Sequence, residues 1–277
     1  MSKANTSAKT TPPEPPSWER ILAHFESLAE LNIRSLRENR ERRLQEYARS
    51  VGIIGLSLHI AASQSLMILV ARGPEGLRED LRPLVPYART EAEQMFRDYY
   101  RPDDTVTTNA LASATGVCMY ECLGLDADGA LAVFKPHLIR IATSRRDEYV
   151  FDHWSRALAA LVLDDRRTWG PIAGLLPNDP IPFTPGATFE FNVQGFIVHL
   201  AGAIVHGRPF DDVLPAWRDF LRSYPYLTRI NMANTTTLLW SARLVHHHIA
   251  GNPLGTTAAF LYEEIRAALA SESEAKS

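Results

Sequence analysis

The sequence predicts an all-α protein: an array of antiparallel helical hairpins that is either α-solenoid-like or an irregular helical bundle. Apolar residues recur mostly at three- and four-residue steps over 17–50. One order of segments also returns several times: an apolar helix rich in small residues, a short break with Gly, Pro or Asp, and a more amphipathic helix. The spacing between these units is irregular, which distinguishes the pattern from a tetratricopeptide array.

The expected elements follow one another from the N-terminus. A mixed-charge amphipathic helix is expected over 17–50, with Ser17 as its N-cap. Five helix pairs are expected after it: 65–71 with 77–85, 112–125 with 130–139, 151–163 with 170–176, 196–205 with 212–221, and 235–249 with 256–269. The segment 176–186 carries four prolines, so it is either a domain boundary or a packed surface loop.

Composition limits the class of protein. The chain has 277 residues, of which 45% are hydrophobic, so it can bury a large core without a metal or disulfide. Two cysteines exclude a disulfide scaffold, and a net charge of -3 argues against nucleic-acid binding through a broad basic surface. We expect a disordered Pro-rich tail at 1–16, a single all-α domain at 17–270, and a frayed tail at 271–277.

The N-terminal part also bears on location. Residues 1–16 contain no apolar run of the signal-peptide type, which predicts a cytoplasmic protein. The segment 51–71 lacks charged residues and is long enough to cross a bilayer. Its middle nevertheless carries the polar residues Ser57, His59 and Gln64, which are unfavourable in a lipid-facing helix. We therefore expect a buried helix and no contact with a membrane.

Motifs for catalysis or cofactors are scarce. The sequence contains no G-x-S-x-G, H-E-x-x-H, P-loop or G-x-G-x-x-G pattern, so we expect neither a cofactor nor a catalytic residue. Cys118 and Cys122 are four residues apart on one helix face, and no further zinc ligands lie nearby in sequence. We interpret them as buried core residues.

Histidines support an alternative function, a helical-bundle metal protein or enzyme. His199 and His206 are seven residues apart and share a helix face, and one residue of the run His246–His248 could join them. Neighbouring residues of an α-helix point about 100° apart, so three consecutive histidines do not converge on one ion unaided. We therefore expect no metal at the run itself and expect its members to differ in burial.

Acidic residues gather at the breaks between helices. If equivalent turns of the array lie along one edge, these carboxylates form a shared negative edge for a protein partner. The alternative is that they only cap helices and favour the positive ends of helix dipoles. The candidate partner-binding residues, called here the acidic edge, are Asp126, Asp128, Asp164, Asp165, Asp211 and Asp212, and Asp103 with Asp104 form a similar pair.

Two phrases resemble a known family. FDHWSRALAALVLDDRRTW, at 151–169, and HLAGAIVHGRPFDDVLPAW, at 199–217, resemble all-α immunity proteins encoded beside bacterial polymorphic toxins, most closely the immunity protein 49 family. The resemblance implies a non-enzymatic protein that binds and neutralises a cognate protein toxin, such as a nuclease effector. A generic helical-repeat scaffold or regulatory protein would show the same pattern of helices.

Overall fold

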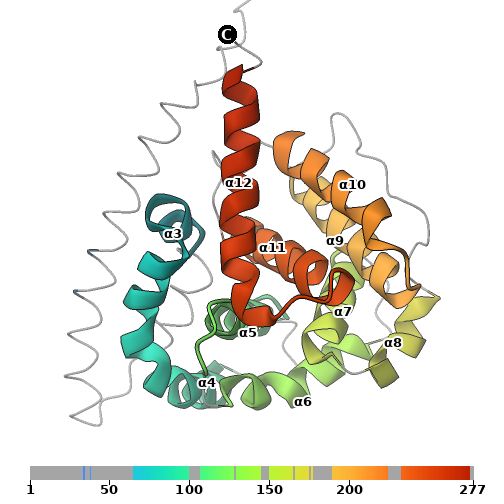
Figure 1. Ribbon diagram of the computed structural model, residues 1–277. Coiled ribbons are helices and arrows are strands. Elements are labelled where there is room, and N and C mark those ends of the chain that lie inside the picture. Colours follow the sequence, from blue (N-terminus) through green and yellow to red (C-terminus); the bar gives the residue numbers. More distant parts are fainter. Residues whose placement is uncertain are drawn as a thin grey trace, which may run out of the picture.

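The chain folds into packed helices, as a computed structural model shows (Figure 1). The structure describes residues 65–99, 107–127, 129–144, 150–164, 166–174, 176, 189–223 and 232–274, together with Arg34 and Glu38, which are helical and exposed. Every regular element within these residues is helical, and none is a strand. The all-α fold class is therefore confirmed for this part of the chain.

The first described helices follow the predicted breaks. Helix α3 (Ser65–Leu81) bends where Gly73 leaves the helical conformation at φ 71°, followed by Pro74. A short helical turn, η1 (Arg82–Leu84), leads into α4 (Val85–Tyr99). Helices α5 (Thr107–Cys122) and α6 (Ala130–Ala142) come next, separated by the expected turn. The predicted break at 72–76 is thus present as a kink, where two helical stretches meet at Gly73.

The middle helices begin earlier than predicted. Helix α7 (Val150–Leu163) is followed by α8 (Arg166–Ala173), whose first residues were expected to belong to the connecting turn. The indole of Trp169 donates a hydrogen bond to the carbonyl of Ala160 at 3.3 Å, which anchors the start of α8 on α7. Helix α9 (Phe189–Val205) begins before the predicted residue 196, and α10 (Phe210–Ser223) completes this group.

Of the last two helices, α11 is surrounded by other helices and α12 covers one face of the molecule. Helix α11 (Met232–Arg243) continues as the π-helical turn η3 (Leu244–Ile249), and after the short turn η4 (Leu254–Thr256) the chain enters α12 (Thr257–Glu274). Helix α11 packs against α3, α5, α9 and α12. In Figure 1, α12 stands between α3 on one side and α9 with α10 on the other.

Small side chains let the helices approach closely in the core. Ala157, Ala159 and Ala160 of α7 are all buried, and α7 packs against both α6 and α9. Cys118 and Cys122 are free thiols buried in α5, as their spacing predicted. Aromatic rings fill the wider gaps: Trp217 and Trp240 are fully buried. The core therefore alternates close alanine contacts with large ring contacts.

Several expected features lie outside the described residues. They include the N-terminal tail, residues 275–277, nearly all of the helix expected at 17–50, and most of the proline-rich segment 176–186. Residues 271–274 of the expected frayed C-terminal tail are described, and they belong to α12, which ends at Glu274. Of the candidate membrane segment 51–71, only Ser65–Ala71 is described, as the start of α3. No helix in the described part of the chain is long and apolar enough to span a bilayer.

Candidate functional site

The π-helical turn at Leu244–Ile249 positions the histidine run. Leu244 and Val245 are fully buried, which holds the turn in the core. The amide of Ala250 donates to the carbonyl of Val245, five residues earlier, at 3.0 Å. This wider bond replaces the usual α-helical one and changes the directions in which adjacent side chains point. The chain then leaves the turn through Gly251, whose φ of 72° favours glycine.

His246 is the structural member of the run. Its ring stacks on Phe260 of α12 with centroids 4.6 Å apart, and its Nε2 lies 2.8 Å from the Thr256 hydroxyl oxygen. Only 9% of the residue is exposed, and burial together with the neighbouring His247 lowers its pKa. These contacts tie the end of η3 to α12 and turn His246 away from the other two histidines.

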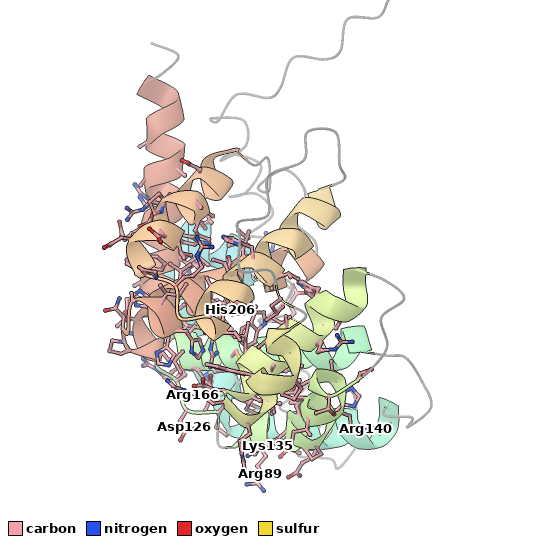
Figure 2. The ribbon with its side chains drawn as sticks, turned by 90° about the vertical axis from the view of Figure 1, so that its right-hand side faces the viewer. Arg89, Asp126, Lys135, Arg140, Arg166 and His206 are labelled. Atoms are coloured by element: carbon pink, nitrogen blue, oxygen red, sulfur yellow. The ribbon has the colours of Figure 1, made fainter. Side chains whose placement is uncertain are left out.

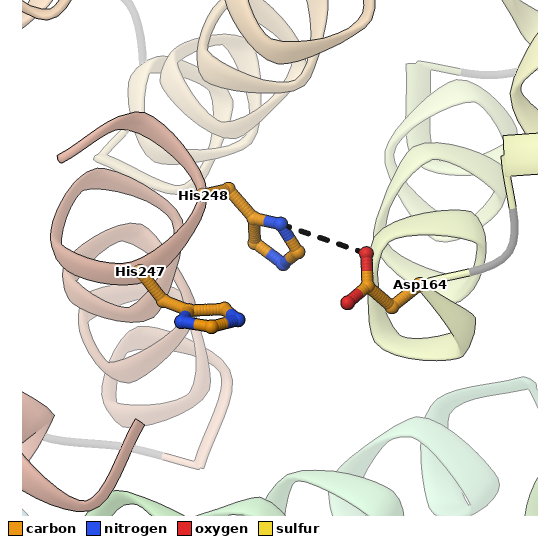
Figure 3. A group of neighbouring side chains, drawn as sticks. All are labelled: Asp164, His247 and His248. Carbon is orange, nitrogen blue, oxygen red and sulfur yellow. Dashed lines mark ion pairs between the residues drawn. The ribbon is translucent and has the colours of Figure 1, made fainter. Parts of the chain in front are cut away.

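Asp164 approaches the run from another part of the sequence. It follows directly after α7 and has φ 50°, the single described residue other than glycine with a positive φ. Non-glycine residues enter this left-handed region at an energetic cost, and Asp and Asn tolerate it best. Asp164 Oδ1 lies 3.6 Å from Nδ1 of His248 (Figure 3). The strained backbone thus carries a carboxylate that faces a buried imidazole.

Asp164, His247 and His248 form one cluster, drawn in Figure 3. One potential ligand atom from each residue lies within 4.8 Å of the others. The rings of His247 and His248 meet edge to face with centroids 4.9 Å apart. As predicted, the three histidines do not converge by themselves, because His246 contacts α12 instead. The group forms because Asp164 approaches His247 and His248 from the end of α7.

An ion pair between the buried Arg243 and the half-buried Glu121 lies next to the cluster. Arg243 Nη1 is 3.4 Å from Nε2 of His248, and Arg243 Nη2 is 3.7 Å from Oε2 of Glu121 in α5. The Arg243 guanidinium also lies over the ring of Trp240, 5.0 Å from its centroid. Burial, followed by the positive charge of Arg243, lowers the pKa of His248 to about 4, so this imidazole is neutral at physiological pH. Burial raises the pKa of Glu121 although Arg243 opposes the change.

The histidines of the alternative hypothesis do not meet the run. His199 is buried in α9, whereas His206 is exposed just beyond that helix, with Nε2 3.3 Å from the carbonyl oxygen of Leu176. Among the described residues, no group of potential metal ligands contains either one. The sequence singled out the run His246–His248, but the meeting with Asp164 depends on a tertiary contact that no local pattern signals.

The other acidic-edge residues occupy different positions relative to their helices. Asp126 is exposed in the turn between α5 and α6, and Asp211 and Asp212 are exposed in the first turn of α10, where the helix dipole favours acids. Asp164 instead lies at the C-terminal end of α7, where the dipole opposes a negative charge. Asp128, Asp165, Asp103 and Asp104 lie outside the described residues.

Basic residues lie near some of the acidic-edge residues. Figure 2 shows Asp126, Arg166 and His206 toward one side of the molecule, while Arg140, near the C-terminal end of α6, lies toward the other. Arg166 belongs to the first turn of α8 and is exposed. The turns after α5, α7 and α9 therefore present both signs of charge.

Comparisons with protein-family models, with characterised proteins and with solved structures find no match.

Proposed function

We propose that this chain is a non-enzymatic immunity protein that binds and neutralises a cognate bacterial toxin in the cytoplasm through the turn surface of a helical-hairpin array. The observation that carries the proposal is a set of exposed carboxylates on the turns: Asp126 between α5 and α6, and Asp211 and Asp212 at the start of α10. The resemblance of 151–169 and 199–217 to toxin immunity proteins supplies the class of partner.

The packing of consecutive helices supports a hairpin array. Helix α6 packs against both α5 and α7, and α7 packs against α8 and α9. The turns after α5, α7 and α9 lie toward the same side, as Asp126, Arg166 and His206 mark in Figure 2. A row of turns on well-packed helices presents its charged groups with little loss of conformational freedom on binding.

A nuclease is the toxin class that this surface fits best. Nuclease domains carry basic surfaces for the phosphate backbone, and exposed carboxylates attract such surfaces during encounter. The net charge is only -3, so complementarity must come from the local arrangement of charges. Arg166, beside the α7–α8 turn, would then repel basic groups of the partner and so restrict the orientation in which the partner binds.

Co-expression with the product of the adjacent gene tests this function. We expect that product alone to arrest the growth of a heterologous bacterial host, and the full-length chain to restore growth and co-purify with it. A non-toxic product, or rescue without a complex, would contradict the proposal. A generic scaffold would bind its partner without protecting the host, so the growth readout separates these two functions.

Charge reversal then tests the surface. The variant Asp126→Lys/Asp211→Lys/Asp212→Lys should weaken the complex, mainly through slower association at low salt. The matched control is Glu79→Lys/Glu93→Lys/Glu263→Lys, which reverses three exposed acids on α3, α4 and α12. Equal weakening by both variants would show that overall charge, rather than the turns, directs binding. Asp164 is left unchanged because it belongs to the histidine cluster.

A further inference from the structure

We propose that Asp164, His247 and His248 bind a divalent transition-metal ion, with Zn²⁺ as the best fit. Two imidazole nitrogens and one carboxylate oxygen are a ligand set that zinc uses in proteins, and three protein ligands leave a coordination position open for water or another donor. The three residues come from η3 and from the end of α7, so the ion would join two elements distant in sequence. This site does not depend on the proposed toxin binding.

The distances suit ligands close to coordination. Atoms bound to one tetrahedral zinc lie about 3.4 Å from each other. His248 Nδ1 and Asp164 Oδ1 are already 3.6 Å apart, and the full set lies within 4.8 Å. Asp164 is about half exposed and the π-helical turn lies against it, so rotation of the side chains alone can close the remaining gap.

A backbone contact orients His247 as metal-binding histidines are usually oriented. His247 Nδ1 lies 2.8 Å from the carbonyl oxygen of Asn252. A carbonyl only accepts hydrogen bonds, so Nδ1 carries the proton, and the lone pair of the neutral ring is on Nε2. Figure 3 shows this ring extending from η3 toward the space between His248 and Asp164. Such an outer hydrogen bond fixes both the tautomer and the direction of a ligating imidazole.

The charges around the cluster balance in favour of a cation. Arg243 faces Nε2 of His248, and the carboxylate of Glu121 compensates its charge from the other side. The carboxylate of Asp164 then leaves one net negative charge among these groups. Coordination through Nδ1 places the His248 proton on Nε2, where two donors then face each other, so metal binding breaks the Arg243–His248 hydrogen bond and leaves Arg243 with Glu121 as its ion-pair partner. This competition predicts weaker binding than at a closed structural site with four ligands.

Metal titration of the purified full-length chain tests the proposal. After chelator treatment and dialysis, isothermal titration calorimetry with ZnCl₂ should show one site per chain, and Co²⁺ should give visible absorption bands of a four- or five-coordinate nitrogen and oxygen site. His247→Ala and Asp164→Asn should each weaken Zn²⁺ binding by about 10- to 100-fold or more. Asn suits the left-handed backbone at residue 164, so the second variant keeps the fold.

The control separates this site from nonspecific binding by histidines. His206→Ala removes an exposed imidazole outside the cluster and should leave Zn²⁺ affinity unchanged. Nonspecific binding to the His246–His248 run would not require Asp164, so unchanged affinity in Asp164→Asn would overturn the proposal. Lack of stoichiometric Zn²⁺ binding by the wild-type chain would overturn it as well. Circular dichroism of each variant confirms that losses do not reflect unfolding.

Discussion

Replacing Asp164 by glycine should stabilise the chelator-treated protein. Asp164 has φ 50° directly after the last residue of α7, the position where helices commonly place glycine. Glycine adopts this conformation without steric cost. The substitution also removes a negative charge from the C-terminal end of a helix, where the dipole disfavours it. Both effects act in the same direction.

The size of the backbone effect is the difference between two opposing free-energy contributions. A left-handed conformation costs an L-residue about 1–2 kcal/mol. Glycine avoids this cost, but it raises the conformational entropy of the unfolded chain, which offsets about 0.4–1 kcal/mol of the gain in stability. The difference between Asp164→Gly and Asp164→Ala isolates this backbone effect, because both variants lack the carboxylate. We expect the Gly variant to be about 1 kcal/mol more stable than the Ala variant, with Asp164→Asn between them.

Urea unfolding at 25 °C with a chelator measures these differences, provided that the m-values stay equal. A Gly variant no more stable than the Ala variant would refute the assignment of a strained backbone to residue 164. Saturating Zn²⁺ adds a second readout. It should stabilise the wild-type chain and leave the Gly variant nearly unchanged, since only the former keeps the carboxylate ligand.

The core supports two further predictions. Trp217 is fully buried, and its ring stacks on Phe260 with centroids 5.1 Å apart. Trp217→Ala should therefore lower the free energy of unfolding, measured by urea titration, by about 3–5 kcal/mol. Ile139 is exposed, so the control Ile139→Ala should change that free energy by less than about 1 kcal/mol. Burial raises the pKa of Cys122 to about 12 and that of Cys118 well above its usual value. Both thiols should therefore resist a thiol reagent at pH 8 until urea opens the fold, and stability should fall as the pH rises above about 8.5, where the unfolded thiols ionise. Rapid labelling of the native chain would contradict this burial.

The helices could largely be predicted because their signals are local. The break GNPLG separates two apolar patterns, and the structure places the end of η3 and the start of α12 on either side of it. Trp169 shows the limit of such signals. Its neighbours Asp164 to Arg167 read as a polar linker, but the indole packs back onto α7 and makes 169 part of a helix. Tertiary contacts therefore decided the boundaries that sequence patterns misplaced.

The candidate site could be predicted only in part for the same reason. The histidine run is visible in the sequence, but its π-helical geometry is not, and neither are the tertiary contacts of His246 with Phe260 and Thr256. Asp164 reads as one of a pair of N-capping residues before α8. Its left-handed conformation instead ends α7 and points the carboxylate at His248. Neither feature has a local sequence signature.

Three locally unfavourable features of the described chain lie close together. Asp164 has a strained backbone and opposes a helix dipole, η3 interrupts regular α-helical bonding, and Arg243 is a buried cation. Each is costly alone, and the large buried core supplies the stability that tolerates them. Because sequences that fold well are otherwise locally consistent, such conflicts concentrate where a function requires them. A bound cation would give all three features one role. It would be held by the strained carboxylate and by the two imidazoles that the π-helical turn brings together. The charges of Arg243 and Glu121 would balance each other behind these ligands.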